Sequence, residues 1–212
     1  MTDLMQLALL LVVLTDFAAM ATSRLTACIR AIALQGVLLG ILPLLSGDGL
    51  SMHVLFLSAG TIVVKAILLP SLLRWAIREA EVRREVEPLV GYMTSVLLSA
   101  AALGVSFAVA ARLPTTGQTG LLVPVALVTL MVGLIMLITR SKAVLQVVGY
   151  LMLENGVYLF GLTQARRVPG LVEAGVLLDV FVGVFIMGIV MFHINREFDS
   201  ISAIKLSELR EP

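Results

Sequence analysis

The sequence predicts an all-α integral membrane protein with seven transmembrane helices. Of its 212 residues, 59% are hydrophobic and only 14% are charged. A soluble fold of this size could not bury that much apolar surface, so lipid must solvate most of the chain. The apolar residues also gather into separate runs, each close to the roughly 20 residues that a helix needs to cross the hydrocarbon core. Turn-rich segments divide these runs.

The predicted spans follow the apolar runs in order. They cover about 3–22, 29–45, 52–76, 89–111, 121–139, 143–163 and 171–192. SGDGLS (46–51) and LPTTGQTG (113–120) are rich in turn residues, and RRVPG (166–170) ends one helix and begins another. The first run has no basic segment before it and no small-residue cleavage site, so we expect a retained span rather than a signal peptide.

The basic residues predict the orientation. Eleven of them fall on one side of the predicted bilayer, and only Arg112, Arg166 and Arg167 fall on the other. The larger set comprises Arg24, Arg30, Arg74, Arg78, Arg83, Arg84, Arg140, Lys142, Arg196, Lys205 and Arg210. Because loops rich in Lys and Arg stay in the cytoplasm, the amino terminus is predicted outside, in the periplasm, and the carboxyl terminus in the cytoplasm.

Several kinds of chemistry find no support in the sequence. Cys28 is the single cysteine, so it cannot by itself hold a zinc ion or an iron–sulfur cluster. His53 and His193 lie at the ends of different spans, which favours capping or interface roles over a metal or haem site. No nucleotide-binding or nucleophile-elbow glycine pattern is present, and no basic patch suggests nucleic acid. We therefore expect no cofactor and no catalytic centre in this chain.

Four charged residues fall well inside predicted spans: Asp16, Lys65, Glu154 and Asp179. A charge at the bilayer centre costs about 2.5–3.5 kcal/mol on insertion scales, so these side chains must face protein or water. At about 1.5 Å rise per residue, all four lie in one band near mid-membrane. They are therefore predicted to form a row within the membrane plane rather than a path straight across it.

Other polar residues share helix faces with these charges. Positions four apart place Gln146, Tyr150, Glu154 and Tyr158 on one stripe, and Gly175, Asp179 and Gly183 on another. Ser58, Thr61 and Lys65 form a third stripe. Pro70 follows it and leaves the carbonyl of Ala66 without its usual helical partner, so we expect a bend beside Lys65.

Two interpretations of the buried charges remain open. They are either paired groups that fix the helix order, which is as good an explanation as function for Asp16, or groups that move protons. Burial destabilises the charged form of an ionisable group, so such groups can take up and release protons near neutral pH. We favour the second interpretation for Lys65, Glu154 and Asp179, with Asn155, Tyr150 and Tyr158 holding linking waters.

The residues around these charges resemble a known family. From about residue 118, the segments TRSKAVLQVVGYLMLENG (139–156) and LVEAGVLLDVFVGVFIMGIVMFHINR (171–196) resemble the K-type subunit of respiratory complex I and the C-type subunit of cation/proton antiporters. With SAGTIVVKAILLPSLLRWAIREA (58–80), the whole chain resembles component E of hydrogenase-4 and formate hydrogenlyase complexes. The resemblance implies a four-helix membrane extension over 1–117 and a three-helix module with a cytoplasmic tail over 118–212.

The resemblance also implies a role and partners. The chain would be a non-catalytic membrane-arm subunit in a bacterial or archaeal inner membrane, contributing buried charges to proton translocation. Its partners would be antiporter-like membrane subunits, a complex I-like membrane anchor and peripheral [NiFe]-hydrogenase and iron–sulfur subunits. Asp179 matches one of the two buried glutamates of K-type subunits, whereas the other would fall at Leu151 and not at Glu154. These positions are three residues apart, so the acid keeps roughly the same face but moves by about 4.5 Å.

Two further functions fit the same sequence. One is a subunit of a multisubunit cation/proton antiporter without a redox partner, although antiporter C-type subunits lack the four added helices. The other is a purely structural spacer between pumping subunits, in which neutral replacements of the buried charges would leave activity intact.

Overall fold

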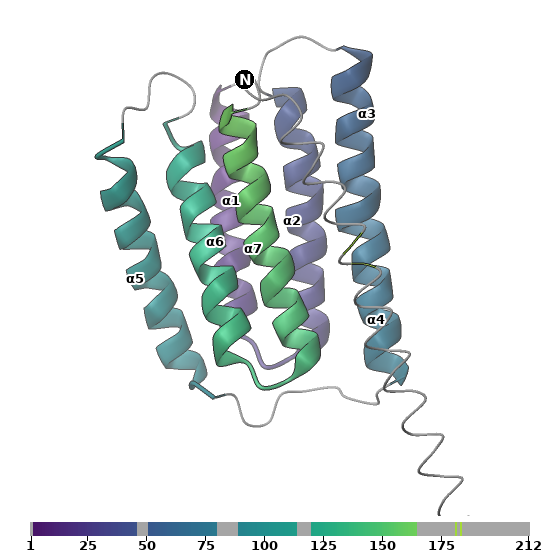
Figure 1. The fold of residues 1–212 in the computed structure, drawn as a ribbon, viewed down its shortest axis with the longest axis vertical. Helices are drawn as coiled ribbons and strands as arrows, with labels where there is room; N and C mark the ends of the chain where they lie inside the picture. Colours follow the sequence, from purple (N-terminus) through teal and green to yellow (C-terminus); the bar gives the residue numbers. More distant parts are fainter. Residues whose placement is uncertain are drawn as a thin grey trace, which may run out of the picture.

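The structure is a computed structural model in which long helices run side by side, as Figure 1 shows. It describes residues 2–45, 51–79, 89–113, 120–164, 181 and 183. Within these ranges, six helices are long and apolar enough to cross a membrane. The chain is therefore a multi-pass helical membrane protein, as predicted. The seventh predicted span, 171–192, lies almost entirely outside the described residues.

The helix bounds agree closely with the predicted spans. They are α1 Thr2–Met20, α2 Leu25–Leu45, α5 Tyr92–Ala110, α6 Leu122–Thr139 and α7 Ala143–Gln164. The third span is a continuous rod made of α3 Met52–Thr61, the π-helix η1 Ile62–Leu68 and α4 Leu69–Glu79. Ser51 caps the start of α3 by accepting a hydrogen bond from the Val54 N–H at 3.2 Å. α2 begins earlier than predicted because helical hydrogen bonding starts ahead of the apolar run, with Cys28 N–H already donating to Arg24 O.

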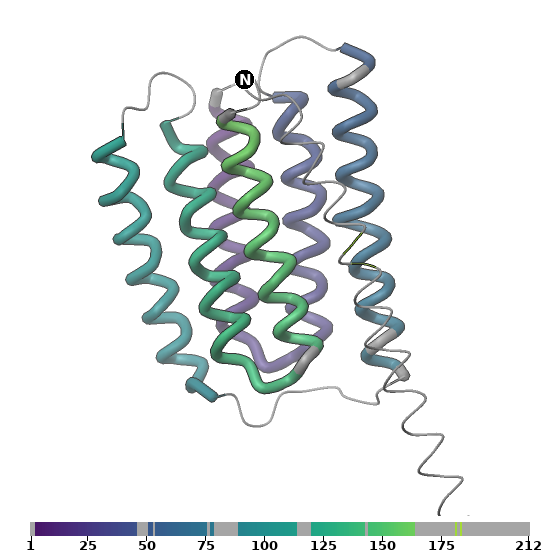
Figure 2. The backbone as a smooth tube through the Cα atoms, in the orientation of Figure 1, coloured from purple at the N-terminus to yellow at the C-terminus, as the bar shows by residue number. Residues whose placement is uncertain are grey.

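Four helices form the centre of the bundle. α1, α2, α6 and α7 pack against one another, while α5 lies beside α6 and the α3–η1–α4 rod lies beside α2 (Figure 1). The tube in Figure 2 shows the same order, with the short α1–α2 and α6–α7 connections at one end of the molecule. Residues from both sides of the predicted boundary at 117/118, such as Ile29 and Val148, share one hydrophobic core.

The outer faces of the bundle are apolar. α5 buries only small side chains on its inner face and exposes large ones, including Met93 and Leu97. α1 exposes Leu7 and Leu10, and α3 exposes Phe56. A helix that shows large apolar side chains to its surroundings is suited to contact with lipid or other membrane helices. The lipid-solvated exterior predicted from composition is consistent with this surface.

Candidate functional site

Lys65 lies in the π-helical segment η1, and the proline that follows explains where this segment ends. Pro70 has no N–H to donate to Ala66 O, so the ordinary α-helical ladder cannot continue through it. Just before it, Leu69 N–H donates to Val64 O, five residues back. The sequence predicted a bend beside Lys65, and the structure has a wider, π-helical turn at this place, a feature that is frequent at functional sites.

Two glycines of α2 fix the backbone of this segment. A Cβ on Gly36 would lie 2.6 Å from the carbonyl carbon of Lys65, and a Cβ on Gly40 would lie 2.3 Å from the side chain of Ile62. The Ser58 hydroxyl also donates to Gly40 O. Small residues of this kind let two membrane helices approach closely. The position of Lys65 is thus set by direct backbone packing against α2.

The opposite side of the site is held by contact between α6 and α7. A Cβ on Gly133 of α6 would lie 2.3 Å from the Leu153 nitrogen, and one on Gly156 of α7 would lie 2.5 Å from the Leu130 nitrogen. Gly149 makes an equally close approach to Leu137. Because Gly149 and Gly156 precede and follow Glu154 on α7, these contacts determine how closely α7 approaches α6 at the level of Glu154.

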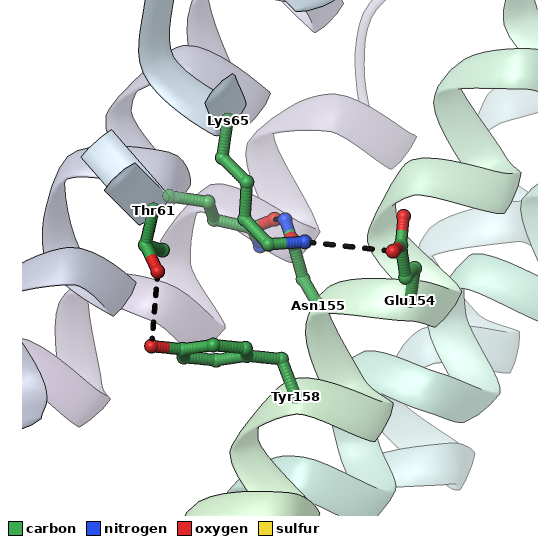
Figure 3. Close-up of polar contacts among 6 residues, drawn as sticks. Thr61, Lys65, Glu154, Asn155 and Tyr158 are labelled. Atoms are coloured by element: carbon green, nitrogen blue, oxygen red, sulfur yellow. Dashed lines mark hydrogen bonds and ion pairs between the residues drawn. The ribbon is translucent and has the colours of Figure 1, made fainter. Parts of the chain in front are cut away.

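Lys65 and Glu154 point toward each other between η1 and α7, as Figure 3 shows. The Lys65 ammonium nitrogen lies 3.9 Å from Glu154 Oε1, and the two side chains are only 3% and 2% exposed. The Tyr158 ring lies beneath the ammonium, with its centre 5.6 Å from the nitrogen. The Tyr158 hydroxyl lies 3.3 Å from the Thr61 hydroxyl. The pair is therefore enclosed by protein rather than by lipid.

A second buried charge, Asp16 of α1, has neutral partners on two other helices. Thr129 Oγ1 of α6 donates to Asp16 Oδ2 at 2.8 Å, and Gln35 Nε2 of α2 donates to Asp16 Oδ1 at 2.5 Å. Gln35 in turn accepts a hydrogen bond from Asn155 Nδ2 of α7 at 3.0 Å. Asp16 and Thr129 are both 0% exposed.

The two clusters together form one polar layer across the bundle. Glu154 and Asn155 are consecutive on α7, so the layer runs from Thr129 through Asp16 and Gln35 to Asn155 and then to the Lys65–Glu154 pair. Side chains of α6, α1, α2, α7 and η1 contribute to it. Three of the four charges predicted to form a row, Asp16, Lys65 and Glu154, contribute to this layer.

A buried lysine–carboxylate pair offers specific chemistry. Its charged and neutral states differ by the transfer of one proton, and desolvation offsets much of the Coulomb attraction that favours the charged state. Hydroxyl groups such as those of Thr61 and Tyr158 can both donate and accept hydrogen bonds to a proton-exchanging neighbour. In the described part of the chain, no three His, Cys, Asp or Glu side chains gather to hold a metal ion.

Arg140 is a further buried charge that the sequence analysis counted only as a loop residue. It is 0% exposed, although it directly follows α6. Its Nη2 donates to Met20 O at the end of α1 at 2.7 Å, and its guanidinium lies 4.6 Å from the centre of the Tyr92 ring. The dipole of α1 also favours the positive charge of Arg140 at this carbonyl end of the helix.

Most of the predicted site residues meet in the polar layer. Asp16, Lys65, Glu154, Asn155 and Tyr158 contribute to it, as described above. Tyr150 is half-buried one turn of α7 before Glu154. Asp179 lies outside the described residues, although Gly183 is described and a Cβ there would lie 3.5 Å from Leu69 Cδ2.

Two members of the layer were missed by the sequence analysis, Gln35 and Thr129. Each is an uncharged polar residue in an otherwise apolar run, and both are buried. A single polar residue within an apolar run was therefore the feature of the sequence that could have indicated them. The charged residues drew attention because their insertion cost is larger.

A helical bundle that encloses a lysine–glutamate pair and a hydrogen-bonded aspartate at mid-span is a polytopic membrane protein with an internal ionisable layer. The chain belongs to the family of a Mycobacterium tuberculosis protein, Uncharacterized protein Rv0085, with which it shares 34% identity over 191 residues, or 88% of this chain and 87% of the relative. It is more distantly similar to hydrogenase-4 component E of Escherichia coli, with 27% identity over 176 residues and 82% of each chain covered. The Shigella flexneri component E gives the same values. No family model and no solved structure matches the chain.

Proposed function

We propose that this chain is a non-catalytic membrane subunit of a hydrogenase complex related to hydrogenase-4 and formate hydrogenlyase, and that its buried charges take part in proton translocation. The enclosed Lys65–Glu154 pair carries the proposal, because such a pair is costly in a membrane and intramembrane ionisable residues mark proton or ion pathways by default. The similarity to hydrogenase-4 component E over most of both chains supports the choice of complex.

The proposal extends to parts of the chain that the structure does not describe. We propose a seventh span at 171–192 carrying Asp179, a periplasmic amino terminus and a cytoplasmic carboxyl terminus in an inner membrane. Residues 118–212 would form the K-type module and residues 1–117 its four-helix extension. The partners would be antiporter-like and anchor membrane subunits, with the nickel–iron and iron–sulfur centres in peripheral subunits. Electron transfer there would supply the energy, and this subunit would respond through its charge states.

Membrane vesicles that contain the assembled complex provide the functional test. We expect Glu154→Gln, Lys65→Met and Asp179→Asn each to abolish most of the proton translocation that accompanies the redox reaction. Asp3→Asn is the matched control, because this carboxylate is exposed in the first turn of α1. Normal translocation by all three variants in a fully assembled complex would show that the buried charges only fix the helix order.

Purification of the chain with its native partners tests the choice of complex separately. We expect mass spectrometry to identify hydrogenase and iron–sulfur subunits beside antiporter-like membrane proteins. Recovery of antiporter subunits without any redox partner would instead assign the chain to a secondary cation/proton antiporter.

A further inference from the structure

Two buried carboxamides connect Asp16 to α7 at the position next to Glu154. Asn155 Nδ2 donates to Gln35 Oε1 at 3.0 Å, and Gln35 Nε2 donates to Asp16 Oδ1 at 2.5 Å. Gln35 and Asn155 are 1% and 2% exposed, so both amides are removed from lipid and solvent. Asn155 directly follows Glu154 on α7. We call Gln35 and Asn155 the amide bridge.

The hydrogen bonds of the amide bridge all point in one direction. Asn155 donates toward Gln35, Gln35 donates toward Asp16, and Thr129 donates to the other Asp16 oxygen at 2.8 Å. An ionised carboxylate only accepts hydrogen bonds, and bonds to it are roughly twice as strong as neutral ones. Asn155 and Gln35 thus form a polarised chain of donors that ends at Asp16 Oδ1, an oxygen that accepts the bond from Gln35.

The effect of protonating Asp16 on this arrangement depends on which carboxyl oxygen takes up the proton. A proton on Oδ1 would face the Gln35 N–H, so the Gln35 amide would have to turn over and present its oxygen. The Asn155 N–H would then lose its acceptor and would have to turn as well. A proton on Oδ2 would instead replace the charge-assisted bond to Gln35 by a weaker neutral one. Protonation on Oδ1 would therefore reorient the residue beside Glu154, whereas protonation on Oδ2 would change only the strength of the bond from Gln35.

A carboxamide can change orientation, but it does not supply or accept a proton as carboxyl, amine and hydroxyl groups do. We propose that Gln35 and Asn155 are positioning residues that couple the charge state of Asp16 to the Lys65–Glu154 pair while preventing direct proton exchange between them. This inference rests on the proposed function, in that it takes the pair to change its protonation state. It makes Asp16 a second ionisable site of one network rather than a step of the proton path.

Among the described residues, few other ionisable groups lie on the helices around the network. Among the helices packed against Asp16, α2 carries exposed Arg30 and buried Cys28, whose thiol donates to Ala19 O. α5 carries Tyr92, which stacks on Arg140 just beyond the end of α6, and no other ionisable residue lies within the bounds of α5 or α6. Around the pair, α7 adds Tyr150 and Tyr158. Among the described residues, the two hydrogen bonds of the amide bridge link Asp16 to α7.

Infrared pH titration of the full chain in lipid tests the coupling. The protonated carboxyl band of Asp16 is identified by its loss in Asp16→Asn, and its midpoint is measured with and without Glu154→Gln. We expect Glu154→Gln to move the Asp16 midpoint by about one pH unit, a tenfold change in proton affinity. In a Gln35→Leu or Asn155→Leu background, the same replacement should move it by less than half as much. Gln146→Leu is the control, because Gln146 lies on α7 outside the bridge and donates to Arg140 O.

A shift that stays the same size without the bridge would overturn the inference, because the charges would then interact through space alone. The absence of any shift with the bridge intact would also overturn it. A measurement on the unmodified chain does not depend on whether the variants fold. In chain labelled with isotopic glutamine, the side-chain amide band should change across the Asp16 titration. An unchanged band would refute the coupling. None of these measurements requires proton translocation, so their outcome can contradict the coupling without contradicting the proposed function.

Discussion

The ammonium of Lys65 lies 3.9 Å from a carboxylate oxygen of Glu154, across the contact between η1 and α7. The two residues are far apart in sequence and come from helices whose positions are set by different glycine contacts, Gly36 on one side and Gly133 and Gly156 on the other. The pair is therefore a consequence of how four helical elements pack, α2 against η1 and α6 against α7, and it responds to changes in that packing as well as to changes in the charges themselves.

Removal of one charge of this pair should cost more stability than removal of both. Lys65→Met or Glu154→Leu alone leaves an uncompensated buried charge, which costs about 3–5 kcal/mol, whereas apolar replacement of both partners is often neutral. We expect each single variant to lower the unfolding midpoint in detergent more than the double variant does. A double variant that loses the sum of the two single effects would show that the side chains act independently.

The close approach of α2 to η1 makes Gly36 intolerant of a side chain. Gly36→Ala would place a methyl group 2.6 Å from the Lys65 carbonyl carbon, so the helices would have to separate. Overpacking of this kind costs about 1–3 kcal/mol. We expect a lower unfolding midpoint and reduced proton translocation by the assembled complex.

Gly60→Ala is the matched control for Gly36. No atom lies within 4 Å of a Cβ built on Gly60, although it lies on the neighbouring helix. Alanine is favoured over glycine in a helix by about 1 kcal/mol, so this variant should be as stable as the unmodified chain or slightly more stable. Equal losses from the two variants would contradict a specific contact between Gly36 and the backbone of Lys65.

The sequence predicted the helical architecture well because insertion into lipid demands long apolar runs. The six described spans follow those runs, and the cost of a buried charge identified Asp16, Lys65 and Glu154. Close glycine contacts and the π-helix at η1 depend on which helices meet, and a single sequence does not contain that information directly. Pro70 nevertheless predicted where the irregularity lies.

The sequence did not predict the partners of the buried charges. Glu154 and Lys65 were each recognised, but their pairing depends on the distance between η1 and α7. Gln35 was not predicted as a site residue because the cost of inserting a neutral amide into a membrane is smaller than that of a charge. Arg140 was counted only toward the orientation because it lies next to a connection, and the burial of its guanidinium against Met20 and Tyr92 was not predicted.

Arg140 should be important for stability in a way that a lysine cannot replace. Its guanidinium donates to Met20 O and lies over the Tyr92 ring, and the planar guanidinium can make both contacts at once, which the single ammonium of a lysine matches only in part. Hydrogen bonds that involve a charged group contribute about 1.5–3 kcal/mol. We expect Arg140→Met to lower the unfolding midpoint strongly and Arg140→Lys to recover only part of the loss. Exposed Lys142→Ala should stay within about 0.5 kcal/mol, and a full recovery by lysine would contradict the stacking contact.

Tyr158 allows the hydroxyl and the ring next to Lys65 to be tested separately. Tyr158→Phe removes the contact with the Thr61 hydroxyl but keeps the ring whose centre lies 5.6 Å from the ammonium. Tyr158→Leu removes both. A cation–π contact contributes about 0.5–2 kcal/mol, and the larger values apply when the contact is desolvated. We therefore expect Tyr158→Leu to be less stable than Tyr158→Phe.

Proton translocation by the assembled complex distinguishes the two roles of Tyr158. If the hydroxyl helps to exchange protons with the pair, Tyr158→Phe should reduce translocation while its unfolding midpoint changes little. Tyr150→Phe is the comparison on the same helix, because Tyr150 is half-buried and was predicted to share this role. Full translocation by Tyr158→Phe, together with a loss in Tyr158→Leu, would limit Tyr158 to shielding the ammonium of Lys65. The proton path would then have to reach the pair from the side of Glu154.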